Sequence, residues 1–114
     1  MSSPSKSPRV LDLERFRGSR ENRVLAGRDE GKQARLDARV DELDTVEDSV
    51  KVLVPHDLFS VTSSFFLGLF EESIRRLGGT RFLEHYAFSG KPIQRVIDDA
   101  IRSAELTSPL RSKR

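Results

Sequence analysis

The sequence predicts a small α/β domain in which a short mixed sheet of about three to four strands is covered by about three helices. Two observations carry this prediction. Stretches with the two-residue alternation of strands recur along the chain, and stretches with the apolar spacing of helices lie between them. With 114 residues, the chain has room for one small domain. Right-handed crossovers are expected to connect successive strands.

The two ends of the chain differ from its middle in composition. Residues 1–8 combine Ser, Pro and Lys, and residues 107–114, TSPLRSKR, carry three basic residues in the last four. Both compositions are typical of disordered tails. The domain is therefore expected at residues 9–106.

The overall composition argues against several classes of function. The absence of cysteine excludes disulfides, thiolate zinc sites and cysteine nucleophiles, and it favours a reducing compartment, so we expect a cytoplasmic protein. No apolar run approaches the roughly 20 residues of a membrane span, and the N-terminus lacks the apolar core of a signal peptide. We expect no membrane partner. A net charge of +2 does not by itself predict a nucleic-acid partner.

The first strand is expected at residues 9–16, RVLDLERF, which alternate weakly before the turn signal Gly18-Ser19-Arg20. A helix over about 29–43 follows, with Asp29 as its cap. Its narrow apolar stripe would consist of Leu36, Val40 and Leu43.

The second strand is expected at residues 50–54, VKVLV, because alternating valines favour a strand over a helix. Residues 44–49 form a polar linker before it, and Pro55 ends it. His56 and Asp57 then fall at the expected carboxyl end of the strand, where open α/β sheets usually place ligands, although such a pair is more often part of an ordinary loop.

The best-supported element is the helix whose apolar face runs from Phe66 to Leu77. The pair Gly78-Gly79 ends it in the manner of a left-handed cap. Gly68 costs about 1 kcal/mol relative to alanine inside a helix, so it predicts a close approach to a neighbouring backbone.

The last third of the chain predicts a strand followed by a helix. Residues 81–88 alternate, with apolar residues on both sides, as an interior strand would. The turn Ser89-Gly90-Lys91-Pro92 then opens a helix that ends near Leu106. Its core stripe would consist of Ile93, Val96, Ile97, Ala100, Ile101 and Ala104.

Signatures of catalysis and of metal binding are largely absent. The sequence contains no HExxH, no GxxxxGK[ST] and no GxSxG motif. A hydrolase would need a serine to converge with His56 or His85 and with Asp57, and nothing in the spacing supports this. We therefore expect no catalytic residue, no metal and no cofactor.

Three hydroxyl residues, Thr62, Ser63 and Ser64, fall where the central helix begins. They can cap the helix, accept a phosphate or face a partner. The residue types alone do not decide among these roles, and the simplest is that Ser63 or Ser64 is an N-cap.

The stretch from VKVLV through LFSVTSSFFLGLFEESIRRLG resembles the strand, loop and helix at the centre of STAS domains, whose anti-sigma factor antagonists carry an Asp-Ser-Ser-Gly-like sequence there. It is still more similar to the STAS-like domain family of unknown function. In that family a Gly-Arg turn, a later Gly with Arg four residues on, and a Ser-Phe helix start recur in this order. The matching residues are Gly18 and Arg20, Gly31 and Arg35, and Ser64-Phe65, so the resemblance covers residues 18–106.

The resemblance implies a regulatory domain that is not an enzyme. Ser64, preceded by Ser63, takes the place of the serine that partner kinases phosphorylate in the antagonists, so a histidine-kinase-like ATPase or a regulatory factor is the implied partner. Two positions depart from the motif. Thr62 replaces the aspartate expected to assist phosphoryl transfer, and Phe65 replaces a glycine with a bulky side chain that makes the loop less open to a kinase.

The leading hypothesis is therefore a protein-interaction domain that docks a partner through the loop at residues 62–66, by way of Thr62, Ser63, Ser64 and Phe65. Two expected i, i+4 ion pairs on the following helix would form a charged rim beside this loop. The rim residues are Glu71, Glu72, Arg75 and Arg76.

A second hypothesis comes from another class of function. A small nucleic-acid-associated accessory protein would use the basic N-terminal segment, with arginines at positions 9, 15, 17, 20, 23 and 28, together with the basic C-terminal tail. The sequence does not predict the oligomeric state.

Overall fold

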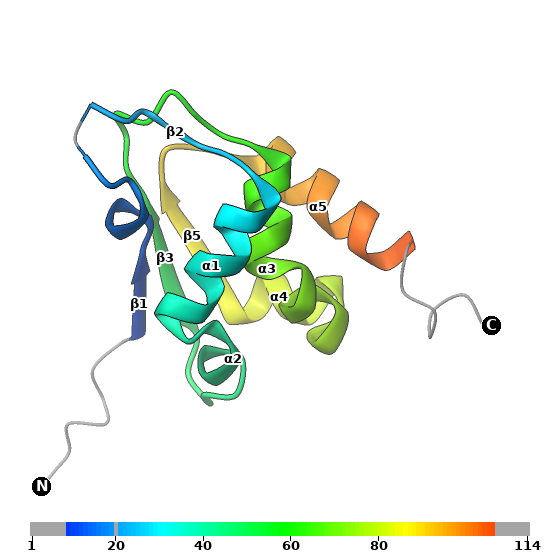
Figure 1. The fold of residues 1–114 in the computed structure, drawn as a ribbon. Coiled ribbons are helices and arrows are strands. Elements are labelled where there is room, and N and C mark those ends of the chain that lie inside the picture. Colours follow the sequence, from blue (N-terminus) through cyan, green and yellow to red (C-terminus); the bar gives the residue numbers. More distant parts are fainter. Residues whose placement is uncertain (1–8, 20, 107–114) are drawn as a thin grey trace, which may run out of the picture.

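The computed structural model of the chain describes residues 9–19 and 21–106. The tails expected at residues 1–8 and 107–114 lie outside these ranges, and so does Arg20. Figure 1 shows the elements in chain order. They are β1 (Arg9–Asp12), the 3₁₀ helix η2 (Leu13–Phe16), β2 (Val24–Leu25), α1 (Arg28–Ala38), α2 (Val40–Leu43), β3 (Val50–Val54), β4 (Ser60–Val61), α3 (Ser63–Leu77), α4 (Gly79–His85), β5 (Tyr86–Gly90) and α5 (Gln94–Leu106).

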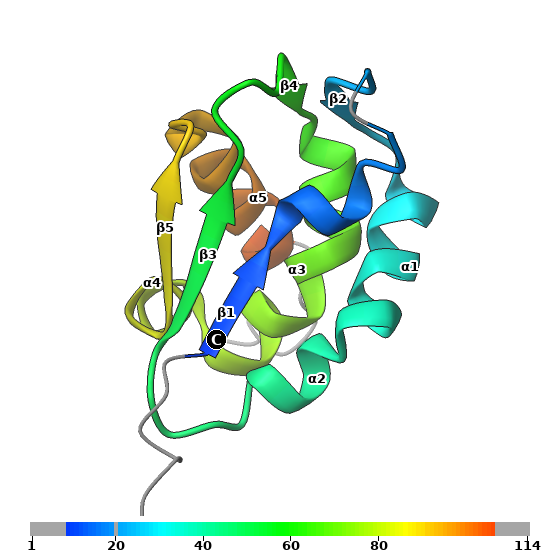
Figure 2. The same cartoon turned by 90° about the vertical axis from the view of Figure 1, so that its left-hand side faces the viewer.

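The strands form a three-stranded sheet in the order β1-β3-β5 and a separate two-stranded sheet of β2 and β4. The α/β class is thus confirmed, but the expected mixed sheet was wrong, because every ladder is parallel. Helical crossovers rather than hairpins connect the strands of the larger sheet, and a crossover returns the chain in the same direction. Figure 2 shows both crossovers to be right-handed, as expected: β1, β3 and β5 run upward, in order from right to left, with the helices behind them.

The larger sheet is covered by helices on one face, as Figure 2 shows. On that face Val50, Val52 and Val54 of β3 are buried, whereas Lys51 on the opposite face is exposed. The helix α3 occupies the middle of the helical layer, between α1 and α5 (Figure 1). Because α3 follows β3, its first turn lies at the carboxyl end of the sheet.

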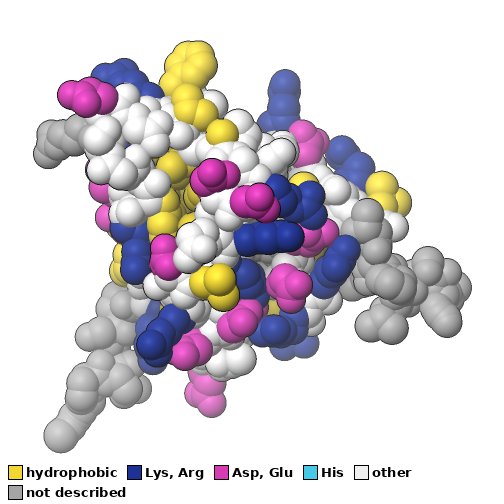
Figure 3. All heavy atoms as spheres, viewed as in Figure 1, with side chains coloured by type: hydrophobic (Ala, Val, Ile, Leu, Met, Phe, Trp, Pro, Cys, Tyr) yellow, Lys and Arg dark blue, Asp and Glu magenta, His cyan; other side chains and the backbone are white. Residues whose placement is uncertain are grey.

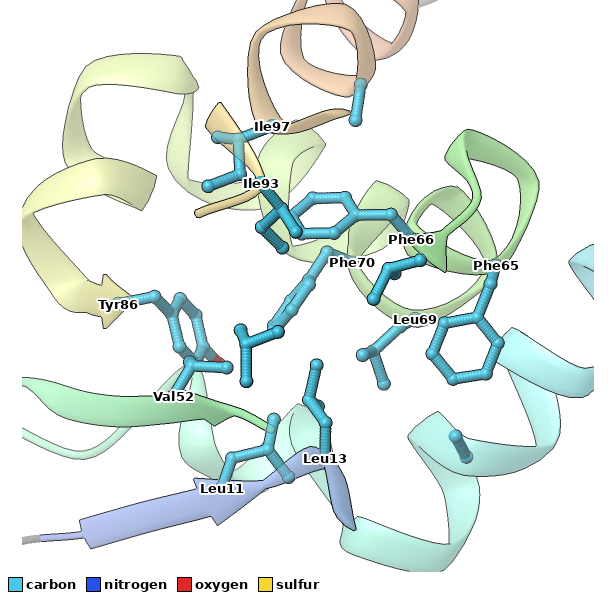
Figure 4. Close-up of a cluster of buried hydrophobic side chains, with 14 of the residues drawn as sticks. Leu11, Leu13, Val52, Phe65, Phe66, Leu69, Phe70, Tyr86, Ile93 and Ile97 are labelled. Carbon is cyan, nitrogen blue, oxygen red and sulfur yellow. The ribbon is translucent and has the colours of Figure 1, made fainter. Parts of the chain in front are cut away.

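The core is an aromatic cluster between α3, α4 and β5. The ring centroid of Phe70 lies 5.0 Å from that of Phe66, 5.2 Å from that of Phe82 and 5.0 Å from that of Tyr86. Figure 4 shows Phe66, Leu69 and Phe70 pointing from α3 into the space that Val52, Leu11 and Leu13 fill from the sheet side. The expected apolar face of this helix is confirmed.

The strand expected at residues 81–88 was wrong in its first half. Gly78, with a φ of +84°, ends α3, and α4 then runs from Gly79 to His85 before β5 begins at Tyr86. Phe82 of α4 and Tyr86, the first residue of β5, are both buried. The alternation of apolar residues in residues 81–88 is compatible with a strand as well as with a short helix, so the pattern did not distinguish the two.

The N-terminal elements are shorter than expected. The first strand ends at Asp12, whose side chain accepts a hydrogen bond from the Glu14 amide and starts the 3₁₀ helix. The helix expected over 29–43 begins after Gly27, not at a capping Asp29, and breaks at Arg39, which has a φ of +55°. The expected stripe was wrong at Leu36, which is 68% exposed. The buried residues of α1 are instead Gly31, Ala34 and Arg35.

Small residues face α3 because the two helices meet at backbone contact. A Cβ on Gly68 would lie 2.2 Å from the Arg28 carbonyl oxygen, and one on Gly31 would lie 2.2 Å from the Phe65 carbonyl oxygen. The Cβ on Gly68 would also lie 2.9 Å from the Gly31 Cα. The close approach predicted for Gly68 is therefore confirmed, and its counterpart on α1 is Gly31.

A buried ion network holds the opposite end of this helix pair. The Arg35 guanidinium donates to the Leu69 carbonyl (2.9 Å), the Ser73 hydroxyl (2.9 Å) and the carboxylates of Asp41 (2.5 Å) and Asp44 (3.1 Å). Asp44 was expected in a polar linker, yet its side chain is fully buried. It also accepts from the Tyr86 hydroxyl at 2.5 Å. Burial, and then this hydrogen bond, raise the pKa of Tyr86 well above its ordinary value, so the phenol stays protonated.

Candidate partner-binding site

The first turn of α3 is capped by Thr62, not by Ser63 or Ser64. Thr62 has extended backbone angles, its Oγ1 accepts a hydrogen bond from the Phe65 amide at 3.2 Å, and its carbonyl accepts from the Phe66 amide at 3.0 Å. Ser63 and Ser64 are the first two helical residues, and both are exposed. Within the described residues neither serine hydroxyl makes a hydrogen bond, so both are available to solvent or to a partner.

This assignment of the cap makes a prediction about stability. Thr62→Ala is expected to lower the free energy of unfolding by about 1 kcal/mol, because the Phe65 amide loses its acceptor. Ser64→Ala is expected to change it by less than about 0.5 kcal/mol. Urea denaturation followed by circular dichroism measures both values. An equal loss for Ser64→Ala would show that Ser64 supports the helix start after all.

Phe65 was expected to face a partner, and the structure corrects this. Its side chain is buried and packs against Phe16, with ring centroids 6.3 Å apart. Figure 4 shows Phe65 pointing away from α3 into the protein interior. Phe65 therefore anchors the first turn of α3, and the exposed part of the expected contact region narrows to Ser63 and Ser64.

The charged rim is only partly as expected. Glu71 pairs with Arg75 at 3.1 Å and also with Arg28 of α1. Arg76, however, pairs with Asp44 at 3.3 Å rather than with Glu72, which is exposed. Figure 3 shows basic and acidic side chains interspersed over this face of α1 and α3. Glu71 and Arg76 thus tie α3 to α1 and to Asp44 at the end of α2, and the rim does not offer one sign of charge to a ligand.

A buried arginine ties together the loops at the carboxyl end of the sheet. The Arg17 guanidinium donates to both carboxylate oxygens of Asp57, at 2.9 and 3.1 Å, and to Glu14 at 2.9 Å. It also donates to the Asn22 carbonyl at 2.9 Å. The hydrogen bonds from Arg17 hold the pKa of Asp57 below its ordinary value. Asp57 therefore pairs with Arg17 and not with a histidine. The sequence did not predict this pair, because the two residues are 40 positions apart.

A surface pocket of 490 Å³ lies beside these loops, where β1, β3 and β5 end. Its polar lining consists of Asp12, Glu14, His56 and Ser89. No hydrogen bond joins two of these side chains, and the described residues contain no cluster of three metal-binding side chains. The pocket thus brings serine, histidine and aspartate together without the contacts of a catalytic triad.

His85, the other histidine considered for a triad, lies at the opposite end of the sheet. It is the last residue of α4, directly before β5 begins, and its Nε2 lies 2.6 Å from the Leu43 carbonyl oxygen. His56 follows the carboxyl end of β3. Because the strands are parallel, the two histidines cannot serve one site.

The structure reveals a feature that the sequence did not predict, a solvent-exposed aromatic side chain. Phe59, just before β4, is 77% exposed. Its amide donates to the Arg23 carbonyl at 2.6 Å, and the Thr62 amide donates to the Leu25 carbonyl at 2.9 Å. The segment that leads into α3 is thereby fixed to β2. The only signal in the sequence was the position of an aromatic residue between a turn and a short strand.

The arginines considered for nucleic-acid binding are largely committed to contacts within the protein. Arg17 is buried in its ion pairs, Arg28 pairs with Glu71, and the Arg15 guanidinium lies 5.5 Å from the centre of the Phe16 ring. Arg20 lies outside the described residues. Of the set, Arg9 and Arg23 are exposed and make no ion pair within the described part of the chain. They do not form a basic patch of several adjacent cations.

Comparison of the chain with protein-family models, with curated proteins and with solved structures gives no significant match. Among residues 9–19 and 21–106, no helix is long and apolar enough to cross a membrane.

Proposed function

We propose that the chain is a non-enzymatic, STAS-like regulatory domain of the cytoplasm that docks a protein partner at the start of α3, with Ser64 as a phosphorylation-sensitive position. The partner class is a regulatory factor or a histidine-kinase-like ATPase. One observation carries the proposal: Ser63 and Ser64 are exposed on the first turn of α3, while Thr62 provides the side-chain cap. The two serines are therefore not needed for helix formation.

The electrostatics of this turn support a switch at Ser64. A phosphate adds close to two negative charges and three acceptor oxygens, and the amino end of a helix favours such a group. The first turn of α3 contains no acidic residue that would oppose it. Phe65, which replaces a glycine of the STAS motif, points into the core and so does not cover Ser64. The same phosphate would repel an acidic partner surface.

The test compares the proteins that three forms of the full-length chain retain from a lysate of the source cells. Ser64→Ala is expected to retain the same protein as the wild type, and Ser64→Asp is expected to weaken its binding by about tenfold or more, since a new charge enters the interface. Ser49→Asp is the matched control, because Ser49 is exposed at the opposite end of the sheet, directly before β3. Equal binding of the retained protein to all forms would contradict the proposal.

A further inference from the structure

The exposure of Phe59 is not a consequence of disorder in its segment, because the neighbouring residues are buried. Leu58 and Val61 are only 2% and 3% exposed, and they hold the chain on both sides of Phe59 against the core. Phe59 therefore points outward from a fixed position. An aromatic side chain left in water forgoes its hydrophobic stabilisation, and aromatic residues, Phe included, are enriched at protein–protein interfaces.

The backbone around Phe59 is held from three directions. The Phe59 and Ser60 amides both donate to the Arg23 carbonyl, at 2.6 and 3.3 Å, and the Leu58 amide donates to the Pro55 carbonyl at 3.3 Å. The ion pair between Arg17 and Asp57 fixes the turn before it. Figure 2 shows the β2/β4 ladder standing above the start of α3, beyond the carboxyl ends of the larger sheet. A preorganised anchor loses little conformational entropy when it binds.

The surroundings of Phe59 indicate the chemistry of what covers it. We call residues 21–25 and 56–61 the β2/β4 lobe. Val24, on the neighbouring strand, is 37% exposed. Two exposed charges of the lobe make no ion pair within the described residues: Glu21 lies in the turn before β2, and Arg23 lies across the ladder from Phe59. The charge of Asp57 is already balanced by Arg17.

An aromatic ring beside an arginine also occurs in proteins that bind single-stranded nucleic acid, but those proteins track the phosphate backbone with a groove of several cations. Among the described residues of the lobe, Arg23 is the one arginine or lysine that accompanies Phe59. A protein pocket needs only one carboxylate at its rim to match it. The charge pattern therefore favours a protein over a nucleic acid as the occupant.

We propose that Phe59 is the anchor of the partner interface, inserting into an apolar pocket of the partner protein whose rim carries a carboxylate opposite Arg23. This inference rests on the proposed function, since it concerns the partner that docks at the start of α3. Ser63 and Ser64 begin α3 one residue after the lobe, and we include them in the same proposed interface. The anchor supplies affinity, and the serines supply the point of control.

The experiment measures the affinity of the retained partner protein for variants of the full-length chain. Phe59→Ser is expected to weaken binding by about 30-fold, the effect of removing a hot-spot aromatic residue. Arg23→Glu is expected to weaken it by about tenfold or more, because like charges then face each other. Leu36→Ser is the matched control: Leu36 is 68% exposed on α1, outside the lobe, and its replacement is expected to leave the affinity unchanged. Melting temperatures of all three variants should match the wild type, because each side chain is exposed.

The outcomes separate this inference from the proposed function. If Ser64→Asp weakens binding and Phe59→Ser does not, the anchor is wrong and the docking site at α3 stands. If Leu36→Ser weakens binding as much as Phe59→Ser, the anchor is also wrong. If nuclease treatment of the lysate abolished retention of the partner, the chain would bind a nucleic acid at this surface, and the inference would be overturned. Retention of no protein, or equal affinity of every variant, would overturn both proposals.

Discussion

Replacing Asp44 by alanine is expected to lower the free energy of unfolding by about 3–5 kcal/mol, the range observed when one member of a buried ion pair is removed. The Asp44 carboxylate is the acceptor that Arg35, Arg76 and Tyr86 share. Without it, the Tyr86 hydroxyl loses its charged acceptor and the buried Arg35 guanidinium keeps the exposed Asp41 as its one carboxylate. Since domains of this size are stable by only about 5–15 kcal/mol, such a loss brings the variant close to unfolding at ambient temperature.

Two milder variants test whether the loss of stability in Asp44→Ala arises from leaving the buried Arg35 charge without its buried acceptor. Tyr86→Phe removes a neutral donor and is expected to cost about 1–2 kcal/mol. Arg76→Met removes a partner whose side chain is 46% exposed, and it is expected to cost less than about 1 kcal/mol. Urea denaturation of the three variants, monitored by circular dichroism, gives the comparison. If Asp44→Ala lowered the free energy of unfolding no more than Tyr86→Phe does, the buried ion pair of Asp44 would not be a major source of stability.

Asp44 also shows where the sequence could not predict the structure. Local pattern places it among polar residues after a helix, and nothing within the segment distinguishes it from Thr45 or Glu47. Its burial depends on Arg35, nine positions earlier, and on Tyr86, 42 positions later. Periodicity predicted α3 and α5 well, because each carries its own apolar stripe. Partners that meet only in the tertiary fold leave no such periodic signal.

The candidate site illustrates the same limit with two phenylalanines. Phe65 belongs to the region predicted as the contact loop, and Phe59 stands six residues before it as an ordinary apolar residue. The structure buries the first against Phe16 and leaves the second in solvent. The difference depends on which side of the first turn of α3 faces the core, and on a ladder between two-residue strands. The position of the hydroxyl residues at the helix start was predictable from local chemistry, and Thr62 is one of them.

Gly68→Ala is expected to destabilise the protein by about 1–2 kcal/mol, although alanine is the better helix former. The gain in helix propensity is about 1 kcal/mol. Against it stands a Cβ placed 2.2 Å from the Arg28 carbonyl oxygen and 2.8 Å from the Lys32 amide nitrogen. Both are backbone atoms of α1, so no side-chain rotation relieves the overlap, and the two helices must separate. Overpacking of a rigid core costs about 1–3 kcal/mol and occasionally more, which outweighs the gain in propensity.

Gly79→Ala provides the matched control for Gly68→Ala. A Cβ on Gly79 would lie 2.8 Å from the Glu105 Oε2 and 2.8 Å from the Ile101 Cγ2, which are side-chain and not backbone atoms, so a smaller loss of stability is expected. Chemical denaturation of both variants measures the difference, and a more stable Gly68→Ala protein would disprove the backbone contact.

A double variant tests that contact from the side of α1. Gly31→Ala places a Cβ 2.2 Å from the Phe65 carbonyl oxygen and should cost a similar amount. Once one Cβ has separated the helices, the second meets less resistance, so Gly31→Ala combined with Gly68→Ala should cost less than the sum of the two. Phe65 lies in the turn that presents Ser63 and Ser64, so the helix separation that lowers stability should also weaken binding of the partner. Additive losses of stability, with partner affinity unchanged, would mean that the contact between the two helices does not position the first turn of α3.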